Sequence, residues 1–317
     1  ATHFRIKGIV MRPKLTIGSR GSKLALTQTN QMADMIRAAL PGVEVDITII
    51  STRGDRILDR PLSEIGGKGL FTEELEAALR DGSIDLAVHS LKDLPTDDPE
   101  GLCIAASPKR VTPNDALVCT KYASLKDLPA GATVGTSSLR RKAQLLALNP
   151  DLKIVDIRGN IGTRMGKVLE TGELDAVILA CAGLERVGLA DVITETIAPE
   201  LMLPAAAQGV LGIQTRADDA ELREALKTIH DTDTYTEALA ERTLLAGLGG
   251  GCQVPIGALA RIDGDTIYLE ACVCSLDGKT TLRTKLSGAV DTAQALGEQA
   301  AQDLLSQGAD AIVAEIY

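Results

Sequence analysis

A cysteine behind three glycines is the feature of this 317-residue chain that points most directly to chemistry. Cys252 ends the run Gly249-Gly250-Gly251-Cys252, and Pro255 follows shortly after. Glycines leave the approach to the thiol free of side chains, so a bulky group could reach the sulfur, and proline fixes the backbone beyond it. We therefore expect Cys252 to carry a group. Two plainer interpretations stay open, because unpaired cysteines are often small buried hydrophobes and glycine runs are often flexible loops.

Basic residues gather where expected strands give way to helices. They are Arg20, Lys68, Arg140, Arg141, Arg158 and Arg164. Helix N-termini combined with arginines make good sites for carboxylates or phosphates, so the set predicts a ligand with many negative charges. For any single member, a solvated surface position is the alternative. A nucleotide competes as the ligand, but the chain contains neither a P-loop nor a GxGxxG motif.

A lysine and an aspartate follow a short apolar stretch in the segment 89–95, His-Ser-Leu-Lys-Asp-Leu-Pro. Functional residues of α/β proteins commonly lie just past strand ends. Asp93 could be a general acid or base, or could stabilise a developing cation, with Lys92 holding its charge in place. The alternative is a plain turn, since 126–129 repeats Lys-Asp-Leu-Pro. The preceding His-Ser and the buried strand distinguish the first copy.

The elements that would position these residues alternate between strand and helix. Apolar patterning predicts strands at 14–18, 43–50 and 84–89, a helix from Ser22 to Leu40 and another over 70–80. Such alternation is typical of a parallel α/β architecture.

A second unit repeats this order along the chain. Residues 132–138 resemble 16–22, each with a strand, a glycine, hydroxyl residues and a helix start, and 169–179 resemble 79–89. We predict two similar α/β domains facing a cleft, where ligands commonly bind. Chance similarity between βα units is the alternative.

The pattern changes after about Asp231. We predict, in order, a helix at 234–245, a hairpin of 266–274 with 279–286, a helix at 290–306 and a strand at 311–316. These elements would form a small α+β domain that carries Cys252.

Composition excludes several classes of function. A net charge of −10 and an aromatic content of 2% without tryptophan argue against nucleic-acid binding. Six scattered cysteines and no export signal favour reduced thiols, and the three distant histidines argue against a zinc site. Cys272 and Cys274 share one face of an expected strand and are core or surface residues. No apolar run is long enough to span a bilayer. Met11 could be the natural start, with 1–10 an appended or trimmed transit segment.

Seven motifs in this order resemble those of the porphobilinogen deaminase (hydroxymethylbilane synthase) family, from about Leu15 to the C-terminus. They are Gly-Ser-Arg-Gly-Ser at 18–22, Gly-Gly-Lys-Gly-Leu-Phe at 66–71, His-Ser-Leu-Lys-Asp at 89–93, Gly-Thr-Ser-Ser-Leu-Arg-Arg at 135–141, Arg-Gly-Asn at 158–160, Pro-Ala-Ala-Ala-Gln-Gly at 204–209 and Gly-Gly-Cys at 250–252.

The resemblance implies a transferase of tetrapyrrole (haem and chlorophyll) biosynthesis. It would join four porphobilinogen molecules head to tail, release ammonia at each step and yield linear hydroxymethylbilane. It implies a dipyrromethane cofactor in thioether linkage to Cys252, no metal, and Asp93 as the carboxylate that contacts pyrrole N–H groups and stabilises the cation left by ammonia. The many cations would bind the acetate and propionate groups of the pyrroles.

The resemblance also implies the site residues and the domain organisation. The catalytic residues would be Asp93 and Lys92; the cofactor would contact Cys252 (covalently), Lys68, Ser90, Asp93, Thr136, Ser138, Arg140, Arg141 and Arg164; the substrate would contact Arg20, Ser22, Arg158, Arg186 and Gln208. Two periplasmic-binding-protein-like α/β domains, 12–110 with 210–230 and 114–205, would precede an α+β domain at 232–317. The segment near Gln208 would cross back, so the first domain is discontinuous.

Three positions depart from the family pattern. Lys23 stands where many relatives have proline, and Gly249 where an acidic residue is common. Glu64 stands where some relatives have a lysine facing the cleft, which puts one contact to the growing chain in doubt. We expect a monomer in the cytoplasm, or in the plastid stroma if 1–10 are a transit remnant, with no nucleic-acid or membrane partner.

A non-enzymatic, two-domain protein that binds an anionic solute is the competing class. Such proteins also have two α/β domains with cationic loops and close by hinge motion. They are typically exported, however, and have no use for Cys252 in a third domain.

Overall fold

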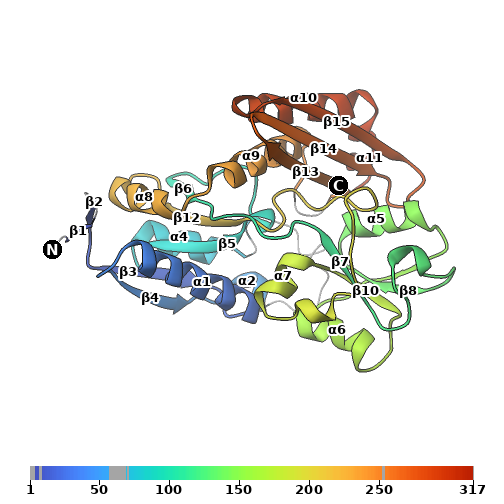
Figure 1. Cartoon of the computed structure of the whole chain (residues 1–317), viewed down its shortest axis with the longest axis horizontal. Helices are drawn as coiled ribbons and strands as arrows, with labels where there is room; N and C mark the ends of the chain where they lie inside the picture. The colour runs from blue at the N-terminus through green and yellow to red at the C-terminus, as the bar shows by residue number, and fades with distance from the viewer. Residues whose placement is uncertain (1–3, 7–8, 57–68, 70, 252–253, 317) are drawn as a thin grey trace. The chain divides into compact units, whose positions relative to one another are not determined.

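The computed structural model describes residues 4–6, 9–56, 69, 71–251 and 254–316 (Figure 1). It separates into two compact units, residues 1–110 with 210–235 and residues 111–209 with 236–317. The division into three domains stays a prediction. In the part of the chain that the structure covers, every helix is too short or too polar to cross a membrane.

The first unit is built on a five-stranded sheet with the order β4-β3-β5-β12-β6. Alternate residues of β5 face two apolar clusters: Leu86 and Val88 pack with α1 and α8, and Ala87 packs with α4. The sheet is therefore covered on both faces, as its continuous apolar strands predict. A hairpin of β1 and β2 precedes it. The elements are β1 (Phe4–Ile6), β2 (Ile9–Met11), β3 (Lys14–Ser19), α1 (Lys23–Ala39), β4 (Glu44–Ile49), α2 (Arg53–Arg56), α4 (Glu73–Asp81), β5 (Leu86–Ser90), β6 (Leu102–Ala106), β12 (Leu211–Arg216) and α8 (Ala220–Leu226).

The second unit contains a sheet of the same form, with the order β11-β7-β10-β8-β9. Ile178 of β10 packs with α5 on one face, and Val177 packs with α6 and α7 on the other. The elements are β7 (Asp115–Cys119), β8 (Thr133–Gly135), α5 (Leu139–Leu148), β9 (Lys153–Val155), α6 (Ile161–Leu169), β10 (Ala176–Ala180), α7 (Cys181–Arg186) and β11 (Glu195–Thr196).

The two sheets confirm the repeat predicted from the sequence. In the first unit, Asp85 accepts a hydrogen bond from the Thr16 amide at 2.8 Å. In the second, Asp175 accepts the same bond from the Thr133 amide at 2.9 Å. The repeated segments thus make equivalent contacts, and the fold is two similar α/β sheets with an additional small α+β part.

The parallel architecture predicted from the alternation of strands and helices holds for only part of each sheet. β3 runs parallel to β4 and β5, but β12 runs antiparallel to β5 and β6; β7 is likewise antiparallel to β10 and β11. The antiparallel strand of the first sheet follows all strands of the second sheet in sequence. An apolar run specifies burial but not strand direction, so its pattern could not reveal this arrangement.

The second unit also carries an antiparallel sheet of β13, β14 and β15, with α10 and α11 packed on it. The predicted helix at 234–245, the hairpin and the helix at 290–306 are confirmed, and Cys272 and Cys274 are core residues. The predicted strand at 311–316 is wrong: Ala309, Ile312 and Val313 are buried at helical spacing in α11. The elements are α9 (Thr232–Gly247), β13 (Ile256–Asp263), β14 (Thr266–Cys274), β15 (Thr281–Ala289), α10 (Ala293–Ser306) and α11 (Ala309–Ala314), and short 3-10 turns occur at Leu91–Asp93, Leu125–Asp127, Ala190–Val192, Lys227–Ile229 and Val290–Thr292.

Candidate functional site

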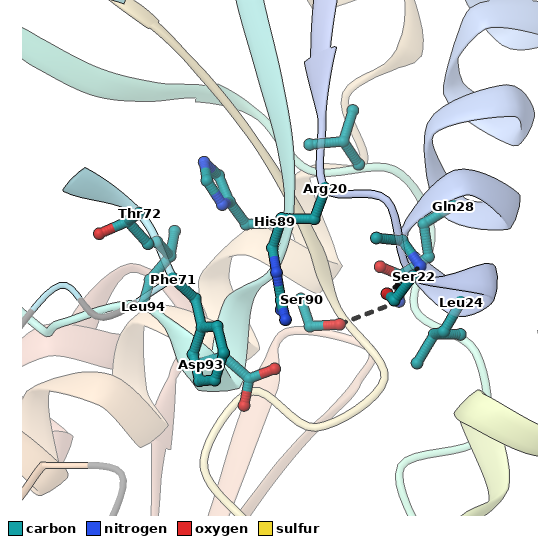
Figure 2. Close-up of a pocket in the computed structure, with 12 residues that line it drawn as sticks. Arg20, Ser22, Leu24, Gln28, Phe71, Thr72, His89, Ser90, Asp93 and Leu94 are labelled. Carbon is teal, nitrogen blue, oxygen red and sulfur yellow. Dashed lines mark hydrogen bonds between the residues drawn. The ribbon is translucent and has the colours of Figure 1, made fainter. Parts of the chain in front are cut away.

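A pocket in the first unit brings together four residues expected from the sequence: Arg20, Ser22, Ser90 and Asp93 (Figure 2). It lies where β3 and β5 end, and the two strands are parallel neighbours in the sheet. Their carboxyl ends therefore meet at one edge, the usual place for ligands in α/β folds.

Local hydrogen bonds fix the polar wall of this pocket. The Ser22 hydroxyl caps α1 by accepting from the Ala25 amide at 3.3 Å. From the next turn of α1, Gln28 donates to the Ser90 hydroxyl at 2.9 Å. Gln28 was not among the expected site residues, because only folding brings it beside β5.

Asp93 ends the 3-10 turn Leu91–Asp93 that follows β5. The turn is closed by the Leu94 amide, which donates to the Leu91 carbonyl at 3.2 Å. The Asp93 carboxylate is exposed, and none of the residues that the structure describes donates a hydrogen bond to it. Figure 2 shows Asp93 among the residues that line the pocket. An exposed acceptor that lines a pocket, and to which no described residue donates, suits a ligand that carries N–H groups.

His89 lies deeper in the pocket wall and is nearly inaccessible. Its Nε2 lies 3.1 Å from Oε1 of Gln214 on β12. Burial lowers the pKa of His89 to about 4, although the Gln214 hydrogen bond acts in the opposite direction. The imidazole is therefore neutral at pH 7, with Nε2–H donating to Gln214.

Arg140 and Arg141 lie in the second unit, at the start of α5, and both are buried. Each donates to the fully buried Asp115, at 2.6 Å from Nη1 of Arg140 and at 2.7 Å from Nη2 of Arg141. Gln208 donates to the same carboxylate at 3.0 Å. Burial alone would raise the pKa of Asp115, but the two guanidiniums lower it well below its usual range. Sequence analysis missed Asp115, which carries no motif of its own.

The same end of the second sheet holds the other expected residues of this unit. The Ser138 hydroxyl caps α5 by accepting from the Arg141 amide at 3.3 Å, and the Thr136 hydroxyl accepts from the Ser138 amide at 3.1 Å. The Arg164 Nε donates to the Gly159 carbonyl at 2.8 Å.

Two arginines of the second unit have buried N–H groups without a partner in the described part of the chain. They are Nη1 of Arg158 and Nε of Arg186. Arg186 donates through Nη2 to the Gly209 carbonyl at 2.8 Å, and burial lowers its pKa to about 10. Buried donors without acceptors are costly, so these two guanidiniums are suited to receive carboxylates from a ligand.

Lys68 and Cys252, two of the expected cofactor contacts, lie outside the described residues, as does Glu64. The preceding glycines have structural reasons of their own. Gly249 follows α9 in the left-handed region with φ 66°, a common helix ending. At Gly250 a Cβ would lie 2.8 Å from Cδ1 of Leu245. The glycine run is thus explained in part by the end of α9.

Metal ligation finds no support in the described part of the chain, where no group of three or more His, Cys, Asp or Glu side chains could hold an ion.

Comparison with solved structures returned distant similarities. The periplasmic VFT2 domain of Bordetella pertussis BvgS is 17% identical, with a TM-score of 0.40 over 68% of this chain and 86% of that domain. The second substrate binding domain of a putative amino acid ABC transporter from Streptococcus pneumoniae is also 17% identical, with a TM-score of 0.42 over 68% and 91%.

Comparison of sequences gave matches over nearly the whole chain. Residues 15–224 match the porphobilinogen deaminase, dipyromethane cofactor binding domain, and residues 235–306 match the porphobilinogen deaminase C-terminal domain. Porphobilinogen deaminase of Maridesulfovibrio salexigens is 49% identical over 304 residues, covering 96% of this chain and 98% of that protein. The Bordetella parapertussis protein of the same name is 50% identical over 303 residues, covering 96% of each. The chain belongs to the porphobilinogen deaminase family.

Proposed function

We propose that this protein is a hydroxymethylbilane synthase, which deaminates four porphobilinogen molecules and joins them head to tail on a dipyrromethane primer held by Cys252. The observation that carries the proposal is Asp93, whose carboxylate is exposed beside a pocket that also contains Arg20 and Ser90. In a chain whose family domain is named for binding dipyrromethane, this is the carboxylate expected to meet pyrrole N–H groups.

The arginines of the second unit fit such a cofactor. Dipyrromethane, when bound, supplies the pyrrole end to which the first substrate unit is added, and its acetate and propionate groups need cationic partners. The buried, unpartnered N–H groups of Arg158 and Arg186 would supply them. Arg140 and Arg141 would add positive charge, since among the residues that the structure describes the two guanidiniums share one carboxylate, Asp115.

The proposed role of Asp93 is electrostatic. When ammonia leaves the aminomethyl group of porphobilinogen, positive charge spreads from the methylene carbon to the pyrrole nitrogen. A carboxylate that accepts a hydrogen bond from that N–H stabilises the charge as it develops. The methylene carbon then forms the new carbon–carbon bond with the free pyrrole carbon at the end of the growing chain, and that pyrrole carbon loses its proton. Lys92, half-buried in the same turn, would add a positive charge next to Asp93 in the sequence.

Intact mass spectrometry under denaturing conditions, followed by a peptide map, tests the proposal. We expect a mass above the sequence value by one dipyrromethane, located on Cys252, and a further gain when porphobilinogen is added. If the chain shows no extra mass and gains none with porphobilinogen, the proposal is wrong and the binding-protein class is favoured.

The sequence also leads us to expect a particular oligomeric state and cellular compartment. We propose a monomer that acts in the cytoplasm. Bacterial relatives that match nearly end to end favour this compartment over a plastid. Sedimentation velocity at micromolar concentration tests the first expectation: a dimer would contradict it.

A further inference from the structure

Arg20, one of the residues expected to bind substrate, is held on two sides by the protein itself. Its Nε lies 3.2 Å from each carboxylate oxygen of Asp55, and its Nη2 donates to the same carboxylate. The guanidinium carbon also lies 4.1 Å from the centroid of the Phe71 ring. One edge and one face of the guanidinium are therefore occupied. Figure 2 shows Arg20 and Phe71 together in the pocket, with Asp93 nearby.

Asp55 is itself firmly placed. The hydroxyl of the fully buried Thr52 donates to it at 2.7 Å, and the Thr52 amide donates at 3.4 Å. Burial would raise the pKa of Asp55, but hydrogen bonds from Arg20 and Thr52 lower it, so the carboxylate stays ionised at neutral pH. The neighbouring Gly54 lies directly on Phe71, because a Cβ there would be 2.2 Å from the ring. Thr52, Gly54 and Asp55 thus form a tight support behind Arg20.

The support leaves part of the Arg20 guanidinium available for a ligand. A guanidinium has five N–H groups, and the edge formed by Nε and Nη2 is turned to Asp55. The Arg20 guanidinium makes no other hydrogen bond within the described chain, so the outer edge of Nη1 and Nη2 is left without a partner there. That edge has the spacing to bind one carboxylate through two parallel hydrogen bonds.

We propose that Asp55 is a positioning residue for substrate recognition: it holds Arg20 in one orientation, so that the outer edge of the guanidinium binds a carboxylate of the incoming pyrrole. This inference rests on the proposed function. An arginine side chain loses much rotational freedom when it binds a ligand. Because Asp55 and Phe71 restrict Arg20 beforehand, less of that freedom is lost when the substrate arrives.

The opposite role for Asp55 would be competition. A carboxylate on Arg20 could mimic the substrate's own and have to be displaced. The geometry disfavours this role, because Asp55 occupies the inner edge of the guanidinium and leaves the outer one open. The two roles predict opposite changes in KM, which makes them separable.

The experiment uses holoenzyme whose cofactor content has been checked by intact mass. In Asp55→Asn, which keeps the size but removes the charge, we expect KM for porphobilinogen to rise about tenfold, as for the loss of one charge-assisted contact, with kcat within about twofold. Thr52→Val, which removes only the hydroxyl that braces Asp55, should raise KM about twofold to threefold. It serves also if Asp55→Asn folds poorly. Asp34→Asn, which breaks an exposed pair with Arg37 in the same unit, is the matched control and should leave KM unchanged.

A double-mutant cycle with Arg20→Lys separates positioning from a merely structural role. Lysine lacks the fork that Asp55 holds, so Asp55→Asn should raise KM no further in that background. An equal rise in both backgrounds, an unchanged KM or a lowered KM in Asp55→Asn would each overturn the positioning role alone. A wild-type holoenzyme that consumed no porphobilinogen would overturn the proposed function as well.

Discussion

Asp93 owes its availability to the turn that presents it, since the hydrogen bonds of that turn are made by the backbone and leave the carboxylate exposed. Asp93→Asn should therefore fold and load cofactor normally, while kcat falls by about 100-fold to 1000-fold, because a neutral amide stabilises the developing cation poorly. Steady-state kinetics together with intact mass check this. A kcat within tenfold of the wild type would contradict the electrostatic role.

The buried His89 should make the stability of the fold depend on pH. Its pKa of about 4 in the folded protein lies below the ordinary value of 6.5, so below pH 6.5 the unfolded chain binds a proton that the folded chain excludes. His89 therefore does not lower the free energy of unfolding above pH 6.5. As the pH falls toward 4, this residue lowers that free energy by up to ~3 kcal/mol. Urea unfolding of wild type and His89→Asn at pH 7 and pH 4.5 tests this. The variant should lose less stability on acidification, and equal losses would contradict the assignment.

The residues that sequence analysis identified and those it missed differ in how local their signals are. Ser22 and Ser138 were recognised as helix starts because each caps the residues that directly follow it. Asp115 was missed because its arginine partners lie 25 and 26 positions away, at the start of another element. Asp55 was missed for the same reason, 35 positions from Arg20. Such partnerships exist only after folding, so one sequence gives no pattern from which to infer them.

At the scale of elements, the repeated strand–glycine–hydroxyl motif has a packing reason. Gly18 and Gly135 occupy equivalent places near the ends of β3 and β8. A Cβ at Gly18 would lie 2.4 Å from Cδ1 of Ile84, and one at Gly135 would lie 2.6 Å from Cδ1 of Leu174. An apolar side chain at the equivalent position, one residue before the equivalent aspartates 85 and 175, thus packs over each glycine.

Gly135→Ala should accordingly destabilise the protein by about 1–3 kcal/mol, because the added methyl group overpacks a filled core. Gly162→Ala is the matched control: it lies in α6, its Cβ would approach only the Asn160 side chain at 3.3 Å, and alanine favours a helix. Thermal or urea unfolding measures both. The interpretation fails if Gly135→Ala is as stable as the control.

Elements themselves were predictable where their signals are local. The predictions of the helix from Ser22 and of the hairpin of β14 and β15 were confirmed, because helix caps and turns depend on residues that are adjacent in the sequence. The strand predicted at 311–316 was wrong because a short apolar run fits either a strand or a buried helical turn, and packing on the β13–β15 sheet selects the helix α11. The direction of β7 and β12 depends on contacts made across the chain, which alternation along the sequence does not encode.

At the scale of the whole molecule, the chain leaves its first unit after residue 110 and returns at residue 210, so one strand of the first sheet is made only after the second sheet is complete in sequence. The return passes through Ala207, whose φ of 60° is unusual for a residue other than glycine, and through Gly209, where a Cβ would lie 2.7 Å from the Val111 carbonyl oxygen. The motif at 204–209 is thus explained in part by the demands of this crossing.

The proposed attachment site of the cofactor, Cys252, lies between the described residues Gly251 and Val254. Cys252→Ser should fold, because Gly250 and Val254 supply packing around the end of α9. It should carry no covalent pyrrole, because a serine hydroxyl is far less nucleophilic than a thiolate. Cys103→Ser, at a partly exposed cysteine on β6, is the matched control and should keep the added mass. Intact mass and circular dichroism measure both. A Cys252→Ser protein that still carried thioether-linked pyrrole would place the attachment at another cysteine, and loss of mass in Cys103→Ser would identify that residue.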